Sequence, residues 1–351
     1  MPEPISEATA TQEVTLTTEQ LVTDVLATID REREREIIAR RFGLFDRKET
    51  LEQIGEMLGI TRERVRQLEK SVISKLKASG EQGSLPRITD FQIKLIETLQ
   101  GMGETARISS LTAKLVADAN KVEQARTAFL ASLCPELIVV TEDEHFYNSV
   151  AIKNSRDEKA LKAAVAKIID SIKKLAEPKE IEEIALAAGI EDAKQAEALA
   201  TTSKQLATLS GRWGLVKWPM VNPKNIRDKI YVILKEHGKH LHFNEIAEAI
   251  KDSEFKRKDV TTQAIHNELI KDKRFVLIGR GIYALKEWGY EKGTVADIIT
   301  EVLKKAGEPL HRDEIVKRVL ESRYVKETTI LLNLQGKPQF KRVAKATYDL
   351  A

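Results

Sequence analysis

The sequence predicts a mainly α-helical protein, in which a helix-turn-helix domain is followed by a tandem array of small units, each built from three helices and a β-hairpin. Aromatic residues make up only 5% of the 351 residues, whereas large β-sandwiches and barrels fill their cores with aromatic and β-branched side chains. Apolar residues recur with a helical period from Thr17 to Ser79. Four pieces of about 60 residues follow and resemble one another, which indicates repeats of one supersecondary unit.

Breaks in composition set the domain boundaries. Residues 1–15 carry three Glu and no Lys or Arg, which predicts a disordered acidic tail. The stretch from Gly80 to Pro86 predicts a linker, and the polar stretch from Asn148 to Arg156 predicts another boundary. The predicted parts are a tail over 1–16, a helix-turn-helix domain over 17–79, and repeats 1 to 4 over 87–152, 157–219, 222–289 and 293–351.

Repeats 3 and 4 are the most alike. Leu241–Ile246 in repeat 3 matches Leu310–Ile315 in repeat 4. A third helix over Thr261–Lys271 precedes two short apolar strands, Phe275–Ile278 and Ile282–Leu285. Three helices closed by a hairpin are the plan of a winged helix, whereas repeats of helical solenoids lack the hairpin. We therefore expect four winged helices.

The helix-turn-helix is predicted within Thr50–Leu76. Thr50 and Gln53 form a capping box that opens a short helix. Gly59 ends this helix, because the turn needs a residue that tolerates positive φ, and Thr61 caps a longer one. The longer helix has an apolar stripe for the core, made of Val65, Leu68, Val72 and Leu76.

The opposite face of the longer helix carries the candidate DNA contacts. From Thr61 to Lys77 there are six basic and two acidic residues, although the whole chain has 57 basic and 54 acidic ones. Arg can pair with guanine, Gln with adenine and Glu with cytosine in the major groove, and other cations hold phosphates. The alternative is a solvated charged helix. The candidates are Thr61, Arg62, Glu63, Arg64, Arg66, Gln67 and Lys70.

The stretch from Ala27 to Leu76 resembles region 4 of housekeeping-type bacterial sigma factors. The segments that carry the resemblance are Asp30–Glu34, Arg40–Leu44, Glu49–Gly55 and Thr61–Glu69. The resemblance implies that the longer helix reads a promoter −35 element, with Arg62, Glu63 and Gln67 at the bases. It implies that Arg64 and Arg66 hold phosphates.

The resemblance also implies RNA polymerase as a partner. Family members grip the flap of the polymerase β subunit, here through the apolar positions Ile37, Ile38, Phe42 and Leu44. After Glu69 the sequence departs from the family's small residues and basic run. Residues 1–16 contain no aromatic side chain that could stack on flipped bases, so we do not expect a complete promoter-opening sigma factor.

Repeat 3 resembles the HARE type of winged helix, as in the N-terminal domain of the RNA polymerase delta subunit, and repeat 4 is a more distant copy. The matching segments are Leu241–Ala247 and Arg274–Leu285. Residues 222–351 hold 26 basic and 19 acidic side chains. The candidates for DNA contact, which are otherwise plain solvated loops, are Lys256, Arg257, Lys258 and the hairpin tip Arg280.

Signals of catalysis are missing from the sequence. The single Cys134 lies among apolar residues and is predicted to be a structural thiol. His237, His240 and His242 lack a partner Cys or acid, and His311 repeats the position of His242, which predicts a capping role rather than a metal site. Phosphate-binding loops and nucleophile elbows are absent from the sequence. We expect no enzymatic activity, no cofactor and no metal.

No apolar run approaches the ~18 residues of a membrane span, and the N-terminus lacks the features of a secretory signal. We therefore expect a cytoplasmic, nucleoid-associated protein. Our first hypothesis is a transcription regulator that binds double-stranded DNA and associates with RNA polymerase. The alternatives are a polymerase-associated adaptor that acts through protein contacts, similar to the delta subunit, and a sequence-indifferent nucleoid protein.

Overall fold

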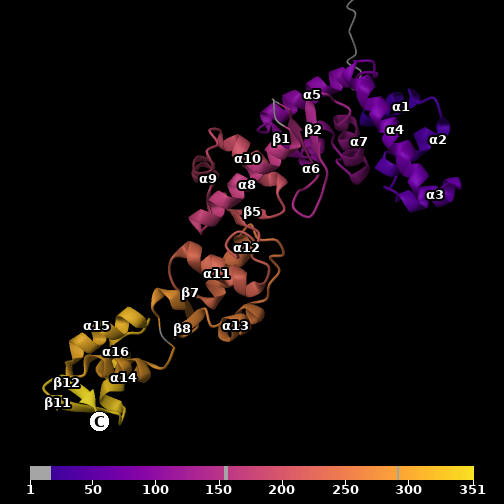
Figure 1. The fold of residues 1–351 in the computed structure, drawn as a ribbon. Coiled ribbons are helices and arrows are strands. Elements are labelled where there is room, and N and C mark those ends of the chain that lie inside the picture. Colours follow the sequence, from indigo (N-terminus) through magenta and orange to yellow (C-terminus); the bar gives the residue numbers. More distant parts are fainter. Residues whose placement is uncertain (1–16, 154–156, 291) are drawn as a thin grey trace, which may run out of the picture. The chain divides into compact units, whose positions relative to one another are not determined.

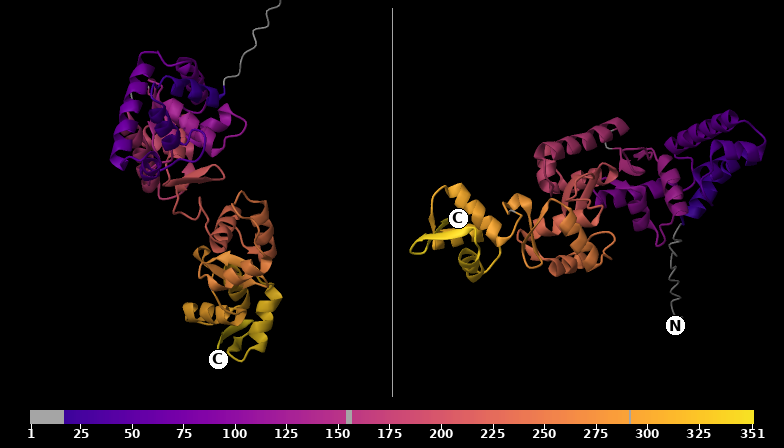
Figure 2. Two further views of the ribbon diagram at one scale, coloured as in Figure 1. Left: turned by 90° about the vertical axis from the view of Figure 1, so that its right-hand side faces the viewer. Right: turned by 90° about the horizontal axis from the view of Figure 1, so that it is seen from below.

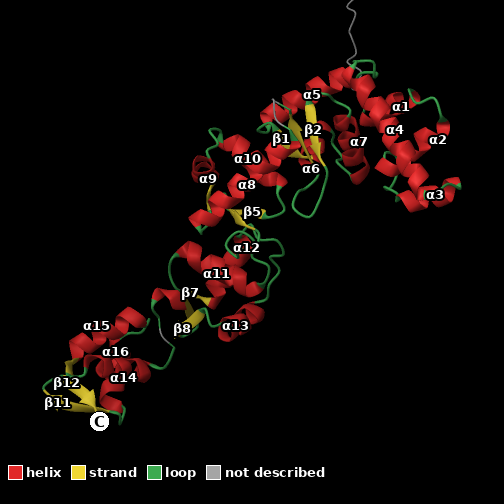
Figure 3. Cartoon of the chain, in the orientation of Figure 1, coloured by secondary structure: helices red, strands yellow, loops and turns green. Residues whose placement is uncertain are grey.

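The computed structural model describes residues 17–153, 157–290 and 292–351, and the predicted tail over 1–16 lies outside these ranges. The described part contains sixteen α-helices and twelve short strands, so helices dominate the fold (Figures 1 and 3). The described residues form two compact units, which divide between Ala207 and Thr208. The mainly helical prediction is confirmed.

The N-terminal domain consists of four helices. Each begins at a residue in extended conformation, and the side chains of Thr17, Thr50 and Thr61 cap three of them. Gly43 and Gly59 end the second and third helices with positive φ. The helices are α1 (Thr18–Ala27), α2 (Glu32–Phe42), α3 (Leu51–Leu58) and α4 (Arg62–Glu81).

Each of the four repeats contains three helices and three strands. Repeat 1 holds α5 (Ile88–Gly101), β1 (Thr105–Arg107), α6 (Ile108–Leu115), α7 (Lys121–Ser132), β2 (Leu137–Val140) and β3 (Ser149–Ile152). Repeat 2 holds α8 (Glu158–Leu175), β4 (Lys179–Glu180), α9 (Ile181–Ala188), α10 (Ala193–Thr202), β5 (Leu206–Leu209) and β6 (Arg212–Leu215).

Repeats 3 and 4 follow the same order. Repeat 3 holds α11 (Ile226–His237), β7 (Leu241–His242), α12 (Phe243–Asp252), α13 (Thr262–Lys271), β8 (Phe275–Gly279), β9 (Ile282–Leu285) and a 3-10 helix over Lys286–Trp288. Repeat 4 holds α14 (Val295–Ala306), β10 (Leu310–His311), α15 (Arg312–Ser322), α16 (Glu327–Gly336), β11 (Phe340–Ala344) and β12 (Thr347–Leu350).

The sheets differ from the two-stranded hairpins that the sequence predicts. Each sheet has three strands, in the orders β1-β3-β2, β4-β6-β5, β7-β9-β8 and β10-β12-β11. The additional strand lies between the first two helices of each repeat and has only two or three residues, too few to show an alternating pattern. The stretch from Asn148, predicted to be a boundary, contains the buried strand β3.

In the first unit, the N-terminal domain and repeat 1 share one hydrophobic core. It runs from Leu21 on α1 through Val72 on α4 to Phe129 on α7 and Val150 on β3. The indigo helices α1–α4 lie directly beside the purple helices of repeat 1 in each view (Figures 1 and 2). The two parts are therefore fused by packing, which the sequence does not predict.

The predicted linker at Gly80 belongs to this core. Gly80 lies in the last turn of α4, and a Cβ atom added there would stand 2.4 Å from the carbonyl oxygen of Leu133. Leu85 is 5% exposed and packs in the same core. The predicted linker is thus a connection between α4 and α5 that is packed into the core, and Gly80 allows close approach to Leu133.

In the second unit, repeats 3 and 4 each have a core of their own. The core of repeat 3 includes Ile233, Ile265 and Phe275, and that of repeat 4 includes Ile299 and Ile330. The backbone N–H of Tyr324 in repeat 4 donates to the carbonyl of Ile278 on β8, at 3.2 Å.

Candidate nucleic-acid interface

The helix-turn-helix has the local geometry that the sequence predicts. The Thr50 hydroxyl accepts from the N–H of Gln53, and the Gln53 side chain accepts from the N–H of Thr50. Gly59 turns the chain with φ +65°. A Cβ atom on Gly55 would stand 2.7 Å from the carbonyl oxygen of Ile60, so the missing side chain lets the turn fold back onto α3.

A small core fixes the angle between these helices. Ile37, Ile54 and Val65 from α2, α3 and α4 are fully buried together. Arg41 on α2 pairs with Glu69 on α4, with 3.2 Å between Nε and a carboxylate oxygen. Because α4 is held from two sides, its remaining face is presented as a rigid surface.

That face carries the candidate DNA contacts, all of them exposed. Val65, Val72 and Leu76 are buried and Leu68 is half-buried, which confirms the predicted division of the helix into two faces. The exposed candidates are Thr61, Arg62, Glu63, Arg64, Arg66, Gln67 and Lys70.

Two of the arginines on the exposed face of α4 are paired with carboxylates. The Arg66 guanidinium donates two hydrogen bonds to Glu63, at 2.8 and 2.7 Å, and these bonds lower the pKa of Glu63 to about 2. Arg62 pairs with Glu52 on α3 at 2.8 Å. A ligand that pairs with Arg62 or Arg66 therefore has to displace these carboxylates.

The apolar positions that the resemblance assigns to the polymerase flap pack in hydrophobic cores of this chain. Ile37, Ile38 and Leu44 are 0% exposed. Phe42 packs against Phe129 of α7, with ring centroids 5.2 Å apart. Ile38, Phe42 and Leu44 pack in the core shared with repeat 1, whereas Ile37 packs with Ile54 and Val65.

Two helices that a winged helix would use for DNA contact are instead packed against other parts of the chain. In repeat 1, α7 lies against α1 and α2, and in repeat 2, α10 lies against β1. Gly103 beside β1 has φ +84°, and a Cβ atom there would stand 2.5 Å from the carbonyl of Lys194. On α10 the side chains of Ala196, Ala198, Leu199 and Ala200 are buried and only Glu197 between them is exposed, a pattern from which this burial could have been predicted.

The third helix of repeat 3 is more open. On α13 the side chains of Gln263, Asn267 and Ile270 are exposed. The predicted cations Lys256, Arg257 and Lys258 are exposed and precede this helix, and Lys229 Nζ donates to the carbonyl of Lys256 at 3.0 Å. The predicted tip residue Arg280 is exposed in the turn between β8 and β9.

The histidines cap helices, as predicted. His242 begins α12, and its Nδ1 accepts from the N–H of Asn244 at 3.3 Å. His311 begins α15 and accepts from the N–H of Asp313 at 3.4 Å. Over residues 17–153, 157–290 and 292–351, no three His, Cys, Asp or Glu side chains are grouped to hold a metal ion.

Cys134 is buried, and its thiol donates to the carbonyl of Leu130 at 3.3 Å. Burial raises the pKa of this thiol to about 12, so Cys134 is a structural residue. In the part of the chain that is described, none of the helices is both long and apolar enough to cross a bilayer.

Comparison with known proteins identifies the helix-turn-helix segment. The family described as Sigma-70, region 4 matches residues 31–78. The chain is 56% identical over 46 residues to RNA polymerase sigma factor sigB of Arabidopsis thaliana, which covers 13% of this chain and 8% of that protein. It is 55% identical over 49 residues to sigma factor RpoD of Helicobacter pylori, which covers 13% and 7%.

Sigma factor SigA of a Bacillus species is 49% identical over 55 residues, which covers 15% of this chain and 14% of that protein. The chain thus matches only a small part of each of these relatives. The matched stretch contains α2, α3 and most of α4, including the exposed face of α4. Residues 31–78 are therefore a sigma-70 region 4 domain within a chain of 351 residues.

Proposed function

We propose that the protein is a DNA-binding transcription regulator whose region 4 domain reads a −35-like promoter element. One observation carries the proposal: each predicted contact on α4 is exposed, while Val65 and Val72 on the other face are held in the core. The N-terminal part of such a helix can enter the major groove, with α3 crossing the backbone. The action proposed is binding, without catalysis or a cofactor.

The proposal includes association with RNA polymerase in the cytoplasm, on the nucleoid. Its support is the similarity of residues 31–78 to RNA polymerase sigma factors. A contact with the β-subunit flap has to use another surface than Ile38 and Leu44, because both are fully buried.

We further propose that the four repeats are winged helices, the last two of the HARE type. The support is three helices and a three-stranded antiparallel sheet in each repeat. Lys256, Arg257, Lys258 and Arg280 are the proposed phosphate contacts of repeat 3. The exposed α13 favours repeat 3 for DNA contact over repeats 1 and 2, whose third helices are packed away.

The test of the proposed function is duplex binding by the full chain. We expect Arg62→Ala and Gln67→Ala each to cost about 1–3 kcal/mol of binding free energy and to relax the sequence preference at one position. Lys77→Ala is the matched control, since Lys77 is exposed on the same helix four turns from its start. Unchanged affinity and unchanged preference in both variants contradict the proposal.

The second candidate function is the polymerase-associated adaptor, and the observation that favours it is that α7 and α10 are packed within the chain and are not free to contact DNA. The dependence of duplex affinity on salt concentration distinguishes the two functions. A protein with several phosphate contacts loses affinity steeply between about 50 and 200 mM salt. An adaptor binds polymerase subunits and shows no duplex binding in the same titration.

A further inference from the structure

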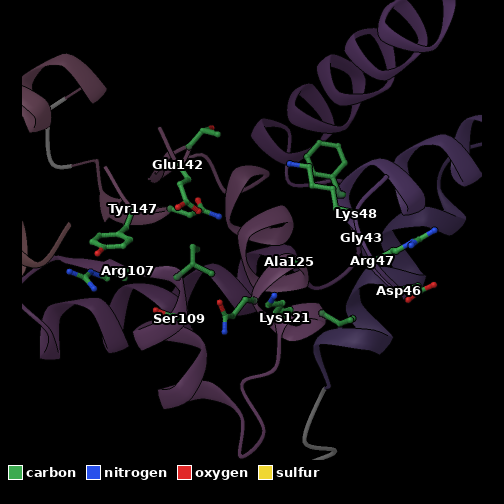
Figure 4. Close-up of a pocket in the computed structure, with 16 residues that line it drawn as sticks. Gly43, Asp46, Arg47, Lys48, Arg107, Ser109, Lys121, Ala125, Glu142 and Tyr147 are labelled. Carbon is green, nitrogen blue, oxygen red and sulfur yellow. The ribbon is translucent and has the colours of Figure 1, made fainter. Parts of the chain in front are cut away.

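A cleft of about 870 Å³ lies in the first unit, between the region 4 domain and repeat 1. Figure 4 shows Gly43, Asp46, Arg47 and Lys48, from the connection between α2 and α3, along one side. Arg107 and Tyr147 lie on the other side. Between them lie Ser109, Lys121 and Ala125, from the first turns of α6 and α7.

The rim of this cleft carries cations without protein partners. Arg47, Lys48 and Lys121 are exposed and form no ion pair within the described residues. Two acidic residues line the cleft. Glu142 is paired with Lys204 at 2.6 Å, so within this lining Asp46 is left to offset the charge of the cations. The lining of the cleft is therefore net positive.

The far wall is fixed by contacts with repeat 2. The Arg107 guanidinium stacks 3.7 Å from the centre of the Tyr147 ring and donates to the carbonyl of Thr201. Burial lowers the pKa of Arg107. Lys204 lies 5.4 Å from the same ring. Because cations already lie over the Tyr147 ring, the cleft favours a phosphate backbone over a single strand whose bases stack on this ring.

The sequence positions of the residues that line the cleft also favour a phosphate backbone as its ligand. Lys48 comes two residues before Thr50, the N-cap of α3. The first helix of a helix-turn-helix crosses the DNA backbone, so cations directly before it stand beside the path of that backbone. Arg107, which starts α6, makes no side-chain cap bond, so the first turn of α6 also favours an anion.

We propose that this cleft holds the sugar-phosphate backbone of duplex DNA next to the segment read by α4, through Arg47, Lys48 and Lys121. The inference rests on the proposed function. Under this inference repeat 1 contacts DNA through Lys121 in the wall of the cleft, although most of α7 is packed against α1 and α2.

The test compares the full wild-type chain with the triple variant Arg47→Ala, Lys48→Ala, Lys121→Ala. Two duplexes are used: the selected element alone, and the same element extended by roughly one helical turn, about 10 base pairs, on each side. On the long duplex we expect the variant to bind roughly tenfold more weakly, with a slope of log affinity against log salt smaller by about 2 to 3. On the short duplex we expect equal affinity.

The matched control is the triple variant Lys94→Ala, Lys114→Ala, Lys167→Ala, which removes three exposed cations that do not line the cleft. It should bind the long duplex with nearly the wild-type salt slope. An unchanged slope in the cleft variant, or equal losses in both variants or on both duplexes, overturns the inference. Those results leave sequence-specific binding by the wild type intact, whereas failure of the wild type to bind either duplex overturns the proposed function itself.

Discussion

The Nε of Arg126 on α7 donates a hydrogen bond to the carbonyl oxygen of Leu44, just after α2, at 2.7 Å. The same guanidinium pairs with Glu123 at 2.6 Å and with Glu19 on α1 at 2.9 Å, and its side chain is only 8% exposed. One buried cation thus ties repeat 1 to α1 and to the connection after α2. We infer that repeat 1 is a brace that fixes the orientation of the N-terminal helices.

Removal of the Arg126 guanidinium should weaken the packing of repeat 1 on the N-terminal helices. We predict that Arg126→Ala lowers the free energy of unfolding by about 3–5 kcal/mol, because Glu123 and the Leu44 carbonyl are left without their partner. Urea unfolding followed by circular dichroism measures the change, and hydrogen exchange should show lost protection in α1, α2 and α7.

Arg31→Ala is the control for this variant. Arg31 pairs with Glu34 at 3.3 Å, but its side chain is 76% exposed, so its removal should cost less than about 1 kcal/mol. If Arg126→Ala and Arg31→Ala have equal effects, Arg126 is not a brace.

Gly80 gives an independent prediction about the shared core. Gly80→Ala places a Cβ atom 2.4 Å from the carbonyl of Leu133, and we expect the resulting overpacking to destabilise the protein by about 1–3 kcal/mol. Gly101→Ala is the matched variant, since a Cβ atom at this helix end meets open space; it should be neutral or stabilising by up to about 1 kcal/mol. Thermal unfolding in which Gly80→Ala is as stable as the wild type disproves the close packing.

The pair of Glu63 and Arg66 predicts a pH dependence. The pKa of Glu63 is lowered to about 2, first by the hydrogen bonds from Arg66. A lowered folded-state pKa contributes stability that is present above the ordinary pKa of about 4.5 and is lost as the pH falls through about 2. We therefore expect the pair to persist, and duplex affinity to show no Glu63 titration, between about pH 5 and 8.

Side-chain NMR titration measures this pKa directly. Arg66→Ala should return the midpoint of Glu63 toward its ordinary value, while Arg41→Ala, which removes a pair on another face of the domain, should not. A wild-type midpoint at the ordinary value contradicts the pairing.

The helix-turn-helix could be predicted from sequence because its signals are local. The capping box at Thr50, the turn at Gly59 and the stripe that includes Val65 all act within a few residues, and the structure has each of them. The short strands could not be predicted, because Leu241–His242 and Leu310–His311 become strands only through pairing with β9 and β12.

The packing of repeat 1 on the region 4 domain could not be predicted either. Ile38 and Leu44 read equally well as a core or as a surface for a partner, and the difference depends on contacts across more than 80 residues, such as Arg126 with Leu44. The cleft has the same origin, since Lys48 and Lys121 are brought together only by this packing.

The central claim is that the exposed face of α4 reads DNA sequence. Selection of bound duplexes from a random pool by the full chain tests it most directly. We expect enrichment of one short −35-like element by the wild type and altered preference in the Gln67→Ala variant. A pool that stays random after selection, or an identical enriched element in both proteins, contradicts it.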